Sequence, residues 1–277
     1  MKIAVLSDIH GNVPALDAVL GDLERWAPDE VIINGDLVSR GPLSLACMEL
    51  LRRRCPQARY IKGNHEEFVV ASARQPCDPD DPLFDLYRFA QWTARQIDGE
   101  VEVLDAWPDH FELTDIEGGS FHITHGSRLG NRDGIRPDTA DADLSEKLGD
   151  PRDLFVGSHT HRPLLRRYNG TLVVNTGSVG QPFDGDHRAA YGQFTFHNGC
   201  WQAEIARVAF DKARASRDFF ESGFVEECGP VAHLIHVEFE QARIHVGPWR
   251  RQYMPAIKAR QTTVAESVRA YLAALNA

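Results

Sequence analysis

Two side chains that bind metal ions stand two residues apart near the start of the sequence. The apolar run from Ile3 to Leu6 is followed by Asp8 and His10, and then by a glycine. Carboxylate oxygens and imidazole nitrogens are both common ligands of transition metals. A single Asp-x-His pair is weak support for a metal site, so its meaning depends on how other apolar runs in the chain end.

Five further apolar runs end at turn residues, and each of them, like the first, is followed by Asp, Asn or His. The segments that follow these five runs are Gly35-Asp36, Gly63-Asn64-His65-Glu66, His125-Gly126, Gly157-Ser158-His159-Thr160-His161 and Asn175-Thr176-Gly177-Ser178. Oxygen and nitrogen ligands without a thiolate suit Mn, Fe, Zn or Ni better than Ca or a structural zinc. The candidates are too many for one open catalytic ion and fit two divalent ions that share a carboxylate. They are Asp8, His10, Asp36, Asn64, His125, His159 and His161.

The elements between the first three runs indicate how these side chains are brought together. Residues 14–26 and 43–53 carry apolar residues at helical spacing, so the N-terminal region alternates strand and helix. This alternation predicts a buried parallel sheet of the α/β class. In such sheets ligands bind beyond the carboxyl ends of the strands, where the candidate ligands stand.

The ordered segments resemble the motifs of the calcineurin-like metallophosphoesterases, D-x-H, G-D, G-N-H-D/E, an isolated H and G-H-x-H. The resemblance covers residues 1 to about 192. Within the family, the chain is similar both to the small bacterial phosphodiesterases and to the diadenosine-tetraphosphatase branch. It implies an α/β four-layer αββα sandwich in which two facing sheets are flanked by helices. It also implies hydrolysis of a phosphodiester or phosphoanhydride, such as a dinucleoside polyphosphate, by hydroxide held between two ions.

The resemblance also implies a role for each residue of the site. Asp8, His10 and His161 would bind one ion, Asn64, His125 and His159 the other, and Asp36 would bridge the two. His65 would protonate the leaving oxygen or stabilise its charge. Arg40, in the segment "GDLVSRGP", would bind a substrate phosphate, and Asn64 would also lie beside the substrate.

Three positions depart from the family pattern. Ser39 stands where the phosphatase branch has an Asp that orients the catalytic His. Ser158 replaces the Gly before the first His of G-H-x-H, and Phe183 replaces an Arg in the G-Q-P-R-D-G segment. These changes leave the ligands in place and leave the substrate class more open.

Two alternative functions fit parts of the same pattern. "GDLVSRG" and "GNHE" also match a Ser/Thr phosphoprotein phosphatase, although Ser39 weakens that match. A non-catalytic metal-binding scaffold of the retromer type is the other alternative. Such scaffolds have typically lost the His of the G-N-H element, whereas this chain retains His65.

Composition narrows the partners and the compartment. Five scattered cysteines without a Cys-x-x-Cys pair favour free thiols in a reducing compartment. The chain has no apolar run long enough for a membrane span, and its first residues do not resemble a signal peptide, so we expect a cytoplasmic protein. The net charge of −10 argues against binding to a nucleic-acid backbone and leaves a small phosphate ester or nucleotide as the partner. A homo-oligomer is compatible with the sequence.

We expect a metallophosphoesterase domain over residues 1–206 and a C-terminal extension, 207–277, that packs on it. The loops 75–82 and 126–153 are expected beside the site, the second with a role in specificity, and a helix follows the first. In the extension we expect helices near 211–221 and 263–274. The alternating run 234–246 favours a strand, with a helix nearly as well supported. The extension could pack on a sheet edge, cover the site or form a dimer contact.

Overall fold

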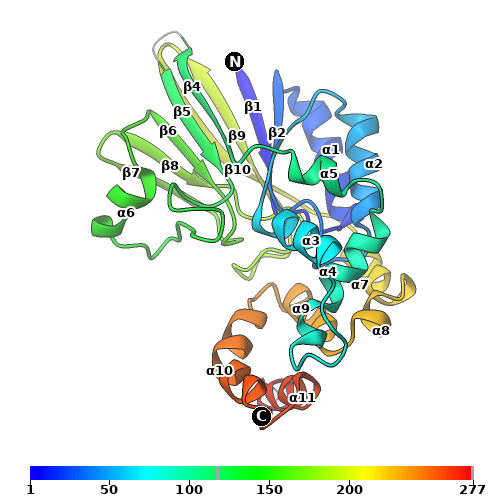
Figure 1. Cartoon of the computed structure of the whole chain (residues 1–277). Helices are drawn as coiled ribbons and strands as arrows, with labels where there is room; N and C mark the ends of the chain where they lie inside the picture. Colours follow the sequence, from blue (N-terminus) through cyan, green and yellow to red (C-terminus); the bar gives the residue numbers. More distant parts are fainter. Residues whose placement is uncertain (117–118, 276–277) are drawn as a thin grey trace.

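Two five-stranded sheets form the centre of the computed structural model, which describes residues 1–116 and 119–275 (Figure 1). The first sheet has the order β10-β9-β1-β2-β3 and the second β4-β5-β6-β8-β7. The strands of the first sheet are β1 Lys2–Leu6, β2 Glu30–Asn34, β3 Arg59–Ile61, β9 Ala189–His197 and β10 Cys200–Val208. Those of the second are β4 His110–Ile116, β5 Gly119–Thr124, β6 Leu154–Gly157, β7 Leu164–Tyr168 and β8 Thr171–Asn175.

The parallel strands of each sheet end at a common edge. In the first sheet β1 pairs in parallel with β2, Leu6 opposite Ile33, and β2 pairs in parallel with β3. In the second, β5, β6 and β8 are parallel, with Val156 opposite both Ile123 and Val174. The antiparallel strands β9, β10, β4 and β7 lie at or toward the edges. This register places the residues after β1, β2, β3, β5 and β6 at the same end of the molecule.

The sheets pack face to face and are covered on their outer faces by helices. Apolar side chains from both sheets fill the space between them, among them Val5, Ile32, Phe121 and Phe194. Helices α1 (Val13–Trp26) and α2 (Ser44–Arg54) cover the first sheet, and α6 (Asp141–Leu148) covers the second. The predicted four-layer αββα sandwich is therefore confirmed.

A further group of helices lies beyond the end of the sandwich where the ligand loops emerge (Figure 1). Its members are α7 Lys212–Glu221, α8 Phe224–Cys228, α9 Pro230–Gln241, α10 Val246–Lys258 and α11 Val264–Leu275, which we call the C-terminal helical layer. It shares one apolar core with α4 (Phe84–Gln96), in which Phe89 and Trp92 meet Phe224 and Trp249. Helices α3 (Asn64–Arg74) and α5 (Val101–Asp105) connect α4 to the sandwich. Among the described residues, no helix is both long and apolar enough to cross a membrane.

The predicted strand at 234–246 is wrong, because this segment is the second half of α9 and the start of α10. Gly229 and Pro230 start α9, where proline fits the first helical turn. The buried residues Val231, Leu234, Ile235, Glu238 and Phe239 then follow helical spacing. The sequence appeared to alternate between apolar and polar residues because only a short stretch of α9 was considered. This helix is buried on a wide face. The helices expected near 211–221 and 263–274 are confirmed as α7 and α11.

Candidate metal centre and adjoining cleft

Loops at the carboxyl ends of five strands bring all seven predicted ligands to one place. Asp8 and His10 follow β1, and Asp36 follows β2. Asn64 is the first residue of α3, directly after β3. From the second sheet, His125 follows β5, and His159 and His161 follow β6. The site therefore lies where the two sheets converge and takes ligands from both.

The side chains form two clusters, each with three ligand atoms within 4.8 Å of one another. In the first, the Nε2 of His161 lies 3.1 Å from the Oδ1 of Asp8 and 3.3 Å from the Nε2 of His10. The second consists of Asp36, His125 and His159. Imidazole nitrogens and carboxylate oxygens that converge this closely on one point are typical of a metal-ligand set.

Asp36, a member of the second cluster, also faces the first. Its Oδ2 is 3.4 Å from the Nε2 of His125 and 3.8 Å from the Nε2 of His10. The Oδ1 of Asn64 lies 3.2 Å from the same Nε2 of His125, so Asn64 adjoins the second cluster. The carboxylate of Asp36 is thus placed to contact ions on both sides.

Backbone carbonyls orient two of the imidazole rings. The Nδ1 of His125 donates to the carbonyl of Asn34 at 2.8 Å, and the Nδ1 of His161 donates to the carbonyl of Gln181 at 2.5 Å. Because a carbonyl oxygen only accepts, the hydrogen of each neutral ring is on Nδ1. The Nε2 lone pair then faces the cluster, as a metal ligand requires.

Backbone strain is concentrated at this site. Seven non-glycine residues of the ligand and phosphate motifs have positive φ angles: Asp8, His10, Asp36, Ser39, Arg40, His159 and His161. Such conformations cost free energy and persist only where the surroundings impose them. The turns also demand glycine, because a Cβ on Gly63 would lie 2.2 Å from the Oδ1 of Asp36. The strain is consistent with loops whose conformation is set by the orientation of the ligand side chains.

The electrostatics of the buried carboxylates fit cations. The Oδ1 of Asp8 and the Oδ2 of Asp36 are buried and accept no hydrogen bond from a described residue. Burial by itself raises the pKa of Asp36, but the neighbouring His125 and His65 outweigh it, and the pKa is well below its usual value. Burial lowers the pKa of His125, yet Asp36 raises it to about 10, so the carboxylate attracts positive charge. The donor set therefore fits the divalent metal ions that the motifs imply.

The rings of His10 and His159 are held in the neutral form that binds metal. Burial lowers the pKa of His10 well below its usual value, and Asp36 opposes this only in part. Burial and the neighbouring His125 lower the pKa of His159 to about 4. At neutral pH both rings therefore keep a nitrogen lone pair available.

Glu66, which was not among the predicted site residues, holds the Asp36 loop in place. Its buried carboxylate accepts hydrogen bonds from the backbone N–H groups of Asp36 at 2.7 Å, Leu37 at 2.8 Å, Val38 at 3.2 Å and Gly63 at 2.8 Å. Burial and then the charge of Asp36 raise the pKa of Glu66 to about 7, against these hydrogen bonds.

Glu66→Ala is expected to destabilise the fold by roughly 3 kcal/mol or more, because the backbone N–H groups that donate to Glu66 lose this acceptor. Denaturant unfolding measures the loss. Glu67→Ala is the matched control, since among the described residues the Glu67 side chain makes only an exposed 3.5 Å contact with Arg132, and its loss should cost under about 1 kcal/mol. Similar losses in the two variants would contradict this role for Glu66.

His65 lies beside the two clusters and belongs to neither. Its backbone N–H donates to the Oδ1 of Asp36 at 2.8 Å, and its ring is edge-on to that of His10. The Nδ1 of His65 lies 3.3 Å from the Oγ of Ser39, the residue that stands in place of the family's Asp. Burial lowers the pKa of His65 to about 3, and Arg40 acts in the same direction.

Arg40 lines the cleft, but part of its guanidinium is already engaged. It forms a buried ion pair with Glu238 of α9, and its Nε donates to the Oε1 of Gln181 at 3.0 Å. Phe183, which replaces the family's Arg, stacks on His161 with the ring centroids 4.3 Å apart. Phe183 therefore packs against a candidate ligand, His161, at a position where the family pattern has an arginine.

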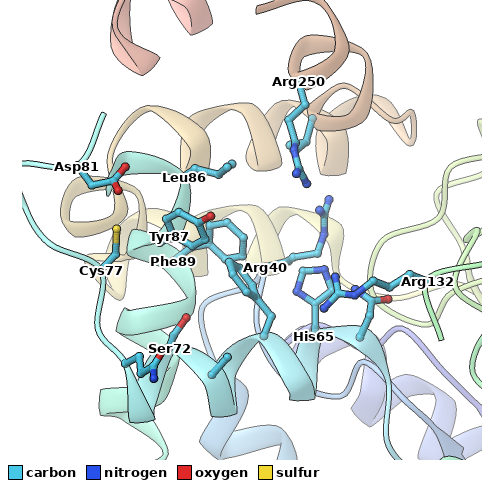
Figure 2. A pocket seen from close by; sticks show the side chains of 15 residues that line it. Arg40, His65, Ser72, Cys77, Asp81, Leu86, Tyr87, Phe89, Arg132 and Arg250 are labelled. Atoms are coloured by element: carbon cyan, nitrogen blue, oxygen red, sulfur yellow. The ribbon is translucent and has the colours of Figure 1, made fainter. Parts of the chain in front are cut away.

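Two cavities adjoin the clusters. One, of about 510 Å³, is lined by Asp36, His159 and His161 and by several arginines, and the other, of about 620 Å³, by aromatic side chains of α3 and α4 (Figure 2). Loop residues expected at the rim do line them, Arg132 in the segment 126–153 and Asp81 in 75–82. The C-terminal helical layer contributes Arg250 to both cavities, so this layer covers one side of the site.

Glu238 and Arg250 were not found from the sequence. Glu238 lay in a run interpreted as a strand, and no local pattern ties it to Arg40, 198 positions away. The only signal for Arg250 was the pair Arg250-Arg251 in an acidic chain. A pair of surface arginines is too common to indicate a binding site.

Comparison with known proteins agrees with this site. The family model described as "Calcineurin-like phosphoesterase superfamily domain" matches residues 1–199. The chain therefore belongs to this family and is a metal-dependent phosphoester hydrolase.

Individual relatives extend the comparison. An uncharacterized protein of Methanocaldococcus jannaschii is 30% identical over 247 residues, which cover 82% of this chain and 95% of that protein. The symmetrical bis(5'-nucleosyl)-tetraphosphatase of Yersinia enterocolitica is 30% identical over 131 residues, 42% of this chain and 44% of that enzyme. A solved metallophosphoesterase from Sphaerobacter thermophilus matches with a TM-score of 0.69 and 26% identity, covering 87% of this chain and 99% of that chain.

Proposed function

We propose that this protein uses two divalent metal ions to hydrolyse a phosphodiester or a phosphoanhydride, with a dinucleoside polyphosphate as a candidate substrate. The observation that carries the proposal is the position of Asp36 between two ligand clusters. Asp8, His10 and His161 would hold one ion. Asn64, His125 and His159 would hold the other, with Asp36 shared.

Two ions held by these residues would polarise phosphoryl oxygens and would lower the pKa of bound water to about 7, which would make a nucleophile available at neutral pH. The chain's own residues do the remaining work. Asp36 and Asp8 set the charge of the site, and Arg40 on its rim offers a guanidinium to a substrate phosphate. Ser39 can donate to the Nδ1 of His65, which leaves the Nε2 hydrogen of His65 for the leaving oxygen.

The candidate substrate rests on a relative and on the cavities. The Yersinia relative is a symmetrical bis(5'-nucleosyl)-tetraphosphatase, and its match spans less than half of that enzyme. The cavities beside the clusters have room for more than one phosphate. A Ser/Thr phosphoprotein phosphatase is the second candidate function, and only the motifs "GDLVSRG" and "GNHE" support it.

The test is hydrolysis of a chromogenic phosphodiester by the purified protein with Mn²⁺ and with a chelator. We expect turnover with Mn²⁺, its loss in the chelator and its return when Mn²⁺ is added in excess. Turnover that persists in the chelator, or none with two ions bound per chain, would contradict the proposal. A phosphopeptide panel that is cleaved while dinucleoside polyphosphates are not would favour the phosphatase.

A further inference from the structure

We propose that Arg250 of α10 and Arg132 of the loop before α6 bind a phosphate that does not react, and that the aromatic cavity next to them binds the base of the same nucleoside polyphosphate. The inference rests on the proposed function for the position of the reacting phosphate at the two ligand clusters. It adds a second phosphate subsite and a base subsite, and it gives the C-terminal helical layer a role in substrate binding.

The two cavities adjoin each other. Arg40, Asn64, His65, Arg132, Val246 and Arg250 line both of them. The ligands His159 and His161 line only the first cavity, and the aromatic residues of α3 and α4 line only the second. A ligand that starts at the clusters must therefore pass the shared residues before it reaches the aromatic walls.

Three of the shared residues, Arg40, Arg132 and Arg250, are cationic in a chain whose net charge is −10. The cavity beside the ligands is lined by six arginines, Arg40, Arg132, Arg136, Arg162, Arg250 and Arg251. Its acidic residues outside the ligand set already have partners, Glu238 with Arg40 and Asp133 with Lys147. Within the described part of the chain, the side chain of Arg250 forms no hydrogen bond or ion pair, and that of Arg132 has only a 3.5 Å contact with Glu67. Both guanidinium groups are therefore available to an anion.

The backbone that carries Arg250 is firmly held. Glu238 is fully buried, and its Oε1 accepts from the backbone N–H groups of His245 and Val246, both at 2.6 Å, where α10 begins. The other oxygen of Glu238 pairs with Arg40. Trp249 is also fully buried and donates from Nε1 to the Oγ of Ser267 at 3.1 Å. The first turn of α10 is thus fixed to the Arg40 loop, and Figure 2 shows Arg250 extending from it toward Arg40, His65 and Arg132.

The second cavity has the chemistry of a base-binding pocket. Phe68, Tyr87 and Phe89 form its wall, with the Phe68 ring centroid 5.6 Å from those of both other rings. Polar groups of Gln75 and Asp81 lie on its lining as well. Aromatic faces with a few polar groups suit a flat heteroaromatic ring. A pocket of about 620 Å³ accommodates a nucleoside.

The order of these features selects the ligand. A reacting phosphate at the clusters, a guanidinium pair next to it and an aromatic pocket beyond match a base joined to at least two phosphates. A phosphopeptide would present a single phosphate and would leave Arg250 and Arg132 unmatched. Inorganic polyphosphate would leave the aromatic wall unmatched.

The phosphate subsite is tested by binding to the metal-loaded full chain, with a methylene-bridged ATP analogue and with AMP as probes. Arg250→Gln is expected to weaken binding of the ATP analogue by about 10- to 100-fold, because a charge-assisted hydrogen bond is lost. Binding of AMP, which lacks the distal phosphates, should change less than about twofold. Arg269→Gln is the matched control, since Arg269 is exposed on α11 and lines neither cavity. An equal effect on both probes, or none on either, would overturn the assignment.

The base subsite is tested with inorganic tripolyphosphate as the second probe. Phe68→Leu should weaken the ATP analogue by about fivefold or more, the scale of one base stacking on an aromatic ring, and should not affect tripolyphosphate. Tripolyphosphate that binds wild type as tightly as the ATP analogue would overturn the base subsite. A phosphoserine peptide that matches the ATP analogue and loses affinity in Arg250→Gln would overturn the nucleotide assignment. None of these measurements requires turnover, so their failure is distinct from failure of the metal-dependent hydrolysis.

Discussion

Asp36→Asn is expected to reduce turnover to the level of the chelated protein and to lower the occupancy of both metal ions together. The Oδ2 of Asp36 faces His125 at 3.4 Å and His10 at 3.8 Å, one from each cluster. Asparagine keeps the shape of the side chain but removes the negative charge that favours two cations. Metal analysis of the purified variant, together with turnover in Mn²⁺, measures the two effects.

Asp8→Asn is the matched control for this prediction. Asp8 is equally buried but belongs to the first cluster alone, with His10 and His161. We expect Asp8→Asn to lower the occupancy of one ion more than that of the other. If Asp36→Asn also loses only one ion, Asp36 does not bridge the clusters.

His65→Ala is expected to lower turnover by about 10²–10⁴-fold while two ions stay bound, the range for general acid–base assistance. His65 lines the cleft next to Asp36 and Asn64 and is in neither ligand cluster. Its removal should therefore take away help to the leaving group without removing a ligand. Steady-state kinetics at saturating Mn²⁺, with metal analysis on the same sample, give both quantities.

The leaving group provides a sharper test of His65. An ester that releases a good leaving group such as nitrophenolate needs little assistance, whereas an alkyl ester needs much more. The loss in His65→Ala should consequently be larger for the alkyl ester. Ser39→Ala removes only the ring's 3.3 Å hydrogen-bond partner and should cause a smaller loss with the same trend. Equal losses for both esters, or loss of metal from His65→Ala, would contradict the assigned role.

The C-terminal helical layer has a physical link to this chemistry. The buried carboxylate of Glu238 joins Arg40, in the loop that follows β2, to the first turn of α10. Removing one partner of a buried ion pair leaves an uncompensated charge, so the link resists separation of the layer from the sandwich. Residues of the layer line both cavities, so of the placements left open by the sequence the layer takes the one beside the site. A dimer contact stays a prediction.

The sequence by itself determined the fold class and the candidate ligands, because both follow from short contiguous patterns of residues. A run such as Ile3–Leu6 predicts a buried strand, and the residues directly after it, Asp8 and His10, must lie at the strand's carboxyl end. Parallel pairing then brings such ends together whatever the rest of the chain does. The order of the motifs added the family and, with it, the four-layer sandwich.

Only the tertiary structure decided what surrounds the ligands. Glu66 holds the Asp36 loop through backbone N–H groups, Glu238 pairs with Arg40 across 198 positions, and Arg250 reaches the cleft from a separate helical layer. None of these partners has a local signature, because a buried carboxylate or an exposed arginine is defined by which distant segment packs beside it. The same reason explains α9, where the sequence favoured a strand: burial against α4 and α11, absent from any local window, stabilises the helix.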